Sequence, residues 1–134
     1  MPNLNPYISF KDTARQAMEF YQQALGGDLD ISTFEAFPDM VDPSEAANVM
    51  HAQLTTEDGL VLMASDTPST MGYQPPQGIS VSLSGPDVDK LRTWWDKLSE
   101  GGEPTMPFAE APWGGYFGMF TDRFGIAWMV ASSE

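Results

Sequence analysis

The chain has 134 residues, of which 42% are hydrophobic and 19% charged, a composition typical of one globular domain and too apolar for a disordered chain. Six Lys and Arg stand against nineteen Asp and Glu, a formal net charge of −13, which disfavours nucleic acid and anionic membrane surfaces as partners. The sequence contains no Cys, no signal-peptide pattern and no apolar run long enough to span a bilayer, so we expect a cytoplasmic protein without disulfides, thiolate chemistry or Cys-ligated zinc.

The first half of the chain predicts the element order βαβββ. A strand is expected at residues 4–10 and a helix at 12–27, with Asp12 or Thr13 as its N-cap and Gly26-Gly27 as its stop. A strand at 28–37 and a polar loop at 38–47 follow. Two more strands, at 48–56 and 60–66, flank the turn Glu57-Asp58-Gly59, which is typical of a hairpin.

The second half repeats this order after a loop rich in Pro and Gly. We expect strands at 78–84, 114–122 and 125–131, a weak strand within 103–114, and a helix at 86–102. Trp94 and Trp95 are adjacent in this helix, so only one is expected to point fully into the core. An exposed Trp would favour a subunit contact, for which Tyr73 and the loop around Met40 are further candidates.

The two halves also match in detail. Both predicted helices end in Gly-Gly, and superposing Gly59 on Gly125 places Met63 over Met129. Each half alone would leave one face of a short sheet bare, so pairing of the halves would complete the core. We therefore expect a single domain over 1–134, with module one at about 1–67 and module two at about 77–134.

Four stretches carry a family resemblance: NPYISF, EFYQQALGG, the pair MHAQL and LMASD, and WGGYFGMFTDRFGIAWMV. With them the chain resembles the PhnB-like branch of the vicinal oxygen chelate superfamily, which includes glyoxalases, bleomycin-resistance proteins and extradiol dioxygenases. The resemblance covers essentially the whole chain. It implies an α+β fold of two tandem βαβββ modules that form a cup-shaped mixed sheet with helices on the outer face, and it implies a homodimer. PhnB-like proteins often carry a 3-demethylubiquinone-9 3-methyltransferase label, but this sequence has no Gly-rich strand-to-helix loop for a methyl donor.

Catalytic members of the superfamily bind a divalent metal inside the cup, through the first and last strands of each module. The resemblance places the last-strand ligand at Met129, and the internal repeat places its counterpart at Met63. The first-strand positions are Asn5 or Pro6 in module one and Gly78 or Ile79 in module two. These side chains do not suit Zn²⁺, Ni²⁺, Mn²⁺ or Fe²⁺, because thioethers prefer softer ions such as Cu(I). We therefore expect no metal and no other cofactor.

Strand alternation assigns the remaining side chains to two faces. The helix-facing set is Ile8, Phe10, Met50, Ala52, Leu54, Leu60, Leu62, Ile79, Val81, Leu83, Tyr116, Gly118, Phe120, Ile126, Trp128 and Val130. The cup-facing set is Tyr7, Ser9, His51, Gln53, Met63, Ser65, Ser80, Ser82, Phe117, Met119 and Met129. Trp113 lies in a loop and would either cover the cup mouth or plug the domain edge. The cup-facing set is mostly apolar with a few hydrogen-bonding groups, as in small-molecule sites.

His51 is the one histidine and the one weak catalytic candidate. It could act as a general base, anchor a ligand, or simply hydrogen-bond a neighbour, and Asp66 could pair with it. Three functions remain open at this point. The first is a metal-free binder of a small, mostly apolar molecule. The second is a glyoxalase-like lyase or isomerase, or a dioxygenase-type enzyme, possibly relying on His51, and the third is an interaction module whose cup is filled by its own side chains.

Overall fold

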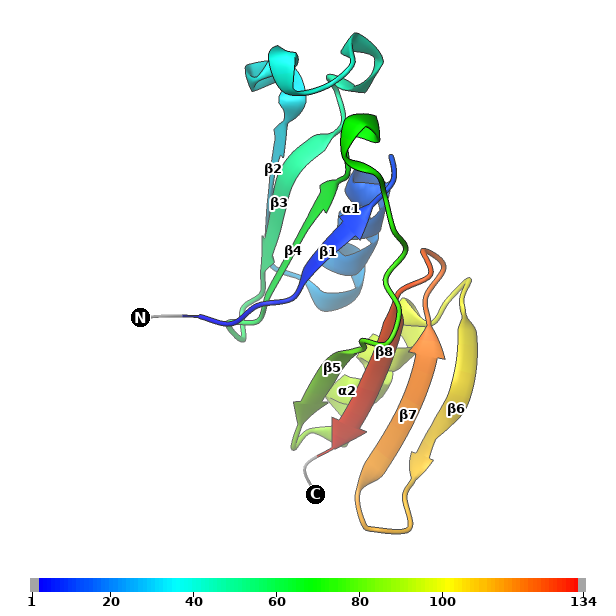
Figure 1. The fold of residues 1–134 in the computed structure, drawn as a ribbon. Coiled ribbons are helices and arrows are strands. Elements are labelled where there is room, and N and C mark those ends of the chain that lie inside the picture. Colours follow the sequence, from blue (N-terminus) through cyan, green and yellow to red (C-terminus); the bar gives the residue numbers. More distant parts are fainter. Residues whose placement is uncertain (1–2, 133–134) are drawn as a thin grey trace. The chain divides into compact units, whose positions relative to one another are not determined.

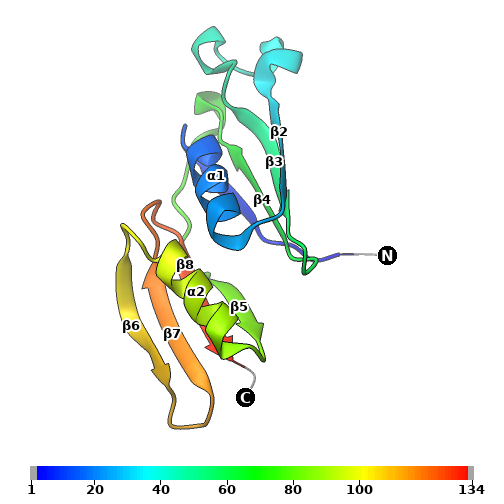
Figure 2. The same cartoon turned by 180° about the vertical axis from the view of Figure 1, so that it is seen from behind.

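The computed structural model describes residues 3–132 and divides the chain into two compact units, Met1–Pro75 and Pro76–Glu134. Each unit is one βαβββ module with a four-stranded mixed sheet and one helix against it (Figures 1 and 2). The predicted α+β fold with two modules is thereby confirmed. No helix among the described residues is long and apolar enough to cross a membrane.

Unit 1 has the sheet order β1-β4-β3-β2, in which β1 runs parallel to β4 and the other neighbours are antiparallel. Its strands are β1 (Tyr7–Phe10), β2 (Asp28–Thr33), β3 (Val49–Thr55) and β4 (Val61–Asp66), and its helix is α1 (Ala14–Leu25). Four short 3₁₀ turns complete it: η1 (Phe34–Ala36), η2 (Pro38–Met40), η3 (Pro43–Glu45) and η4 (Ser69–Met71).

Helix α1 packs on the sheet through the stripe that its periodicity predicts, since Ala17, Met18 and Tyr21 are fully buried. Thr13 is the N-cap, but its side chain caps nothing. The carboxylate of Asp66, at the end of β4, accepts the Ala14 backbone N–H at 2.9 Å instead. The helix therefore begins where a distant strand supplies the acceptor that its first turn needs.

Unit 2 repeats the arrangement with the order β5-β8-β7-β6 and β5 parallel to β8. Its elements are β5 (Val81–Gly85), α2 (Val88–Leu98), β6 (Glu103–Glu110), β7 (Tyr116–Thr121) and β8 (Ala127–Ser132). Asp87 caps α2 by accepting the Lys90 N–H, as expected for an Asp at this position. The weak strand expected within 103–114 is a full strand.

Both tryptophans of α2 are buried, so the expectation that only one of them points into the core is wrong. The Trp95 ring stacks on Phe108 of β6 and meets the edge of Phe120 of β7. The Trp94 ring is covered in part by the Lys90 side chain, whose Nζ lies 5.4 Å from its centroid. The sheet thus buries Trp95, and the Lys90 side chain of the same helix helps to cover Trp94. Neither tryptophan is exposed, so α2 is no longer a candidate subunit contact on that ground.

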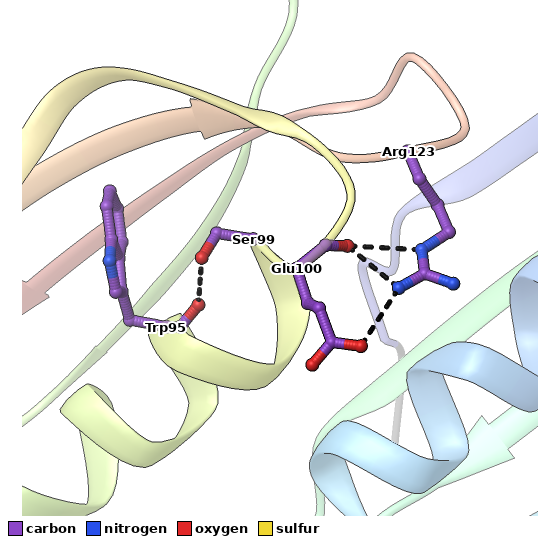
Figure 3. A network of polar contacts seen from close by, with 4 residues as sticks. All are labelled: Trp95, Ser99, Glu100 and Arg123. Carbon is purple, nitrogen blue, oxygen red and sulfur yellow. Dashed lines mark hydrogen bonds and ion pairs between the residues drawn. The ribbon is translucent and has the colours of Figure 1, made fainter.

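The end of α2 is closed by polar contacts from the turn between β7 and β8 (Figure 3). Arg123 donates from Nε and Nη2 to the Glu100 carbonyl oxygen at 3.1 and 2.9 Å, and Nη2 also lies 3.4 Å from the Glu100 carboxylate. The Ser99 hydroxyl donates to the Trp95 carbonyl at 2.7 Å. A cation placed over free carbonyls at a helix C-terminus is stabilising.

Two expected helix-facing positions, Ile79 and Leu60, differ from the prediction. Gly78 has φ +76°, outside the extended region, so β5 begins only at Val81, and Ile79 lies before it with 77% of its surface exposed. Leu60 belongs to the hairpin turn, where its N–H donates to the Thr56 hydroxyl, and it is 39% exposed. At both positions alternation was extended beyond the true strand ends. Tyr116, at the start of β7, lies on the helix side as predicted, partly buried with the Arg92 side chain of α2 over its ring.

Met50 was also expected on the helix side, and the structure places Val49 there, with 1% exposure. The β2–β3 register passes from Ser32–His51 to Thr33–Val49, so Met50 is the extra residue of a β-bulge. The Val49 N–H donates to Asp66, while Met50 lines a cavity described below. The bulge inverts the alternation for the start of β3.

Candidate functional site: the open faces of the two sheets

Each sheet has one face turned away from its own helix, which we call its open face. In unit 1 the cross-strand partners Tyr7–Met63–Gln53 and Ser9–Ser65 share this face, and His51 lies two residues from Gln53 on the same side. In unit 2 it holds Ser82, Phe117, Met119 and Met129, again through direct pairing. The residues expected to line a cup therefore share a face within each unit, with the exception of Ser80, which precedes β5.

Tyr7 and His51 form a polar pair on the open face of unit 1. The Tyr7 hydroxyl lies 3.1 Å from His51 Nδ1, and their ring centroids are 5.6 Å apart. Because β4 lies between β1 and β3, this pair bridges across the central part of the sheet. Sequence analysis suggested Asp66 as a partner of His51 and identified Tyr7 only as a lining residue.

Asp66 is not the partner of His51. Its carboxylate is 3% exposed, and its two oxygens accept the N–H groups of Ala14 and Val49, each at 2.9 Å. The suggested Asp66–His51 pair is therefore wrong, because strand alternation turns Asp66 to the helix side, where it joins α1 to β3. Asp66 has a structural role.

A cavity of about 470 Å³ lies at the end of the unit 1 open face where β1 and β4 finish. We call it the methionine pocket, and it is lined by Ser9, Phe34, Met40, Met50, Ser65, Asp66, Thr67, Pro68, Met71, Gly72 and Gln74. Of these, Ser9 and Ser65 were expected on the cup side. The β-bulge places Met50 in the lining, and the 3₁₀ turns place Phe34, Met40 and Met71 there. Strand alternation in the sequence predicts neither the bulge nor the 3₁₀ turns.

One wall of the methionine pocket is fixed by a polar contact that we call the Glu45–Ser69 clasp. The Glu45 carboxylate accepts the Ser69 hydroxyl at 2.8 Å and the Ser69 backbone N–H at 3.1 Å. Ser69 begins η4, which supplies Met71, and Gly72 follows it. The clasp thus joins η3 to the segment that closes the pocket on one side.

A second cavity, of about 510 Å³, adjoins the same end of unit 1 and shares Thr67 with the methionine pocket. Its lining is polar: Lys11, Asp12, Ser44, Glu45, Asn48, Thr67, Ser69 and Tyr73. Several of these groups satisfy one another, since Asn48 donates to Asp12 at 2.7 Å and Glu45 belongs to the clasp. Tyr73, considered above as a subunit contact, lies here.

The open face of unit 2 is dominated by sulfur and aromatic side chains. Met106 of β6, Met119 of β7 and Met129 of β8 are direct cross-strand partners and form a row. Trp113 precedes β7, is 72% exposed, and meets Phe117 edge-on at 5.6 Å between centroids. Of this row, the sequence identified Met119 and Met129 and missed Met106, because two register irregularities in β6 obscured its side.

The donor groups at the superfamily's metal positions do not fit a divalent metal. Met63 lies between Tyr7 and Gln53, and Met129 lies between Ser82 and Met119. The first-strand residues paired with the two methionines are therefore Tyr7, and not Asn5 or Pro6 as expected, and Ser82, and not Gly78 or Ile79. Residues 3–132 contain no group of three or more His, Cys, Asp or Glu side chains placed to hold a metal ion. Thioethers, a hydroxyl, a phenol and an amide are weak ligands for such ions.

The fold of two βαβββ modules, each a mixed sheet with one helix packed against it, identifies the class of protein, and sequence comparison identifies the family. The profile of the Glyoxalase/Bleomycin resistance protein/Dioxygenase superfamily matches residues 3–130, so the chain belongs to that superfamily.

Three relatives cover nearly the whole chain. Protein YjdN of Escherichia coli K12 is 29% identical over 138 residues, which span 95% of this chain and 92% of YjdN. The crystal structure of PA1353 from Pseudomonas aeruginosa is 36% identical, with a TM-score of 0.88 and 98% of each chain covered. A PhnB protein from Bacillus cereus is 22% identical, with a TM-score of 0.78, and covers 98% of this chain and 100% of its own; at this identity it supports the fold alone.

Proposed function

We propose that this PhnB-like member of the superfamily binds a small, mostly apolar molecule on its open sheet surface without using a metal. The observation that carries the proposal is the methionine pocket. Its volume of about 470 Å³ lies within the range of roughly 300–1,000 Å³ that is usual for small-molecule sites. Thioether side chains from Met40, Met50 and Met71 can adapt to varied ligand shapes.

The remaining predicted site residues extend this surface. Tyr7, His51, Gln53 and Met63 continue the open face of unit 1 beyond the pocket. Trp113, Phe117, Met119 and Met129 give unit 2 an apolar face of its own. Aromatic and thioether groups with a few hydrogen-bonding partners suit ligands that are largely apolar.

Native mass spectrometry of protein taken directly from its host tests the proposal. We expect a small-molecule adduct that is lost on denaturation, and elemental analysis of chelator-free protein should show no stoichiometric divalent metal. A one-to-one transition metal would contradict metal-free binding. Filling the pocket with Met50→Trp should remove the adduct, whereas Leu60→Trp, at an exposed turn position away from the pocket, should retain it.

The same spectrum tests assembly. We propose a cytoplasmic homodimer, and the exposed apolar side chains of Ile79, Met106 and Trp113 in unit 2 are candidates for its contact. We expect a mass of two chains at micromolar concentration. A monomer at that concentration would contradict the dimer and leave the binding proposal to its own test.

A second candidate function is metal-free proton transfer, as in a lyase or isomerase, and the Tyr7–His51 hydrogen bond favours it. In one tautomer the Tyr7 hydroxyl donates to His51 Nδ1, which fixes the ring and leaves Nε2 as the second polar atom. With a substrate identified by mass spectrometry, His51→Ala would abolish turnover and Tyr7→Phe would reduce it. Unchanged turnover in His51→Ala would exclude this candidate, while an altered affinity alone would fit a binder.

A further inference from the structure

We infer that the methionine pocket selects uncharged molecules with an apolar body and one hydroxyl or carbonyl oxygen, which Ser9 and Ser65 bind. This inference rests on the proposed function and names its ligand class. Alcohols, phenols and ketones with a compact hydrocarbon body belong to that class; carboxylates, phosphates and ammonium ions do not.

The two hydroxyls form a ready polar site on the pocket lining. Ser9 of β1 and Ser65 of β4 are direct partners in the parallel ladder, so their side chains lie on the same face beside each other. Neither hydroxyl makes a hydrogen bond within residues 3–132, and neither does the Gln74 side-chain amide on the same pocket. Hydroxyls donate and accept, so one pair can bind either a carbonyl or an alcohol oxygen.

Charge in and around the pocket disfavours anions, and the pocket lining offers no available carboxylate to bind a cation. Among the described residues that line the pocket there is no Lys, Arg or His to balance an anion, and the chain carries a net charge of −13. Asp66 is the one acidic group in that lining. Its two oxygens accept backbone N–H groups from α1 and β3 and the residue is 3% exposed, so little of the carboxylate is accessible to a cation in the pocket.

The apolar part of the ligand meets a wall that is built from three separate segments. Phe34 and Met40 come from η1 and η2, Met50 comes from the bulge of β3, and Met71 comes from η4. Thioethers and a phenyl ring provide apolar contact area and need no hydrogen-bond partner on the ligand. The polar and apolar lining groups thus match the two parts of the proposed ligand.

Four probes of one shape test the inference: 2-naphthol, naphthalene, 2-naphthoate and 2-naphthylmethylammonium, titrated calorimetrically at pH 7 into the full chain. We expect 2-naphthol to bind about fivefold more tightly than naphthalene, the equivalent of one hydrogen bond, and both ions to bind at least tenfold more weakly than 2-naphthol. Equal or tighter binding of either ion would overturn the selection for neutral molecules.

Variants assign the hydrogen bond. Ser65→Ala should weaken 2-naphthol about fivefold and leave naphthalene unchanged, and Ser9→Ala is a second variant with the same expectation. Thr93→Ala, which removes an exposed hydroxyl of α2 in unit 2, is the control and should change neither affinity. If both neutral probes bind and neither serine variant discriminates between them, the inference is wrong and the proposed function stands. If no probe binds, the pocket is wrongly assigned, and the native mass spectrum then decides the proposed function separately.

Discussion

The two units share a backbone design down to single hydrogen bonds. In both hairpins the backbone N–H of the turn's first residue donates to the carbonyl of the residue just before the next strand: Thr56 to Leu60, and Asp122 to Ile126. Each turn residue also accepts the N–H of that same residue with its side chain, at 3.1 Å for Thr56 and 3.0 Å for Asp122. The sequence repeat that aligned Gly59 with Gly125 therefore describes equivalent turns.

The open faces of the same two units differ. Where unit 1 has His51, Gln53 and Ser65, the equivalent positions of unit 2 are Phe117, Met119 and Ala131. Unit 1 carries a polar pair and a cavity beside two hydroxyls, and unit 2 carries a row of methionines with an exposed indole. The helix-side cores of the two units are alike in role, so the difference lies on the open faces, where the proposed function places ligand binding.

The largest expected loss of stability concerns a glycine that, in each unit, lies close to the backbone of a neighbouring strand end. A Cβ on Gly27 would collide with Thr55 O, and one on Gly102 would collide with Thr121 O. We expect Gly102→Ala to lower the free energy of unfolding by about 3 kcal/mol, and Gly27→Ala by about 1 kcal/mol more, because Gly27 also has φ +96°.

Gly85→Ala is the matched control for these variants. Its Cβ would meet nothing within 4 Å, and its φ lies outside the left-handed region, so we expect a change within about 0.5 kcal/mol in urea unfolding. A Gly102→Ala protein as stable as the Gly85→Ala protein would contradict the equivalence of the two close approaches.

Truncating the turn side chains should lower the free energy of unfolding by different amounts in the two units. Asp122 accepts the N–H groups of Phe124 and Ile126 and the indole N–H of Trp128, whereas Thr56 accepts a single backbone N–H. We expect Asp122→Ala to cost about 3 kcal/mol and Thr56→Ala about 1 kcal/mol, measured by urea unfolding. Equal losses would show that the indole contact adds nothing in unit 2.

The smallest effect concerns the Glu45–Ser69 clasp. Glu45→Ala frees η4 and should weaken 2-naphthol about threefold, since an exposed charge-assisted contact contributes about 0.5–1 kcal/mol. Glu100→Ala removes the carboxylate that faces Arg123 in unit 2 and should leave the affinity unchanged. Equal affinities for the Glu45→Ala and wild-type proteins would show that η4 keeps its place without the clasp.

The sequence predicted the features that depend on hydrophobic periodicity and on glycine-containing helix ends and turns. Gly26 and the turn Glu57-Asp58-Gly59 marked a helix end and a hairpin correctly, and alternation placed Met63 and Ser65 on one face. It failed where the backbone leaves the regular period, at the bulge that turns Met50 toward the pocket and at Gly78, after which β5 begins late. The 3₁₀ turns that bring Met40 and Met71 to the pocket depend on tertiary contacts such as the clasp, which no local pattern encodes.

Methyl NMR of protein labelled with ¹³C at its nine methionine methyl groups tests the central claim most directly. Signals are assigned with single Met→Leu variants, and 2-naphthol is titrated in, since its aromatic ring shifts the resonance of any methyl group that it contacts. The account predicts saturable shifts for Met40, Met50 and Met71, with Met106, Met119 and Met129 unaffected. Shifts confined to the row in unit 2, or none at all, would contradict it.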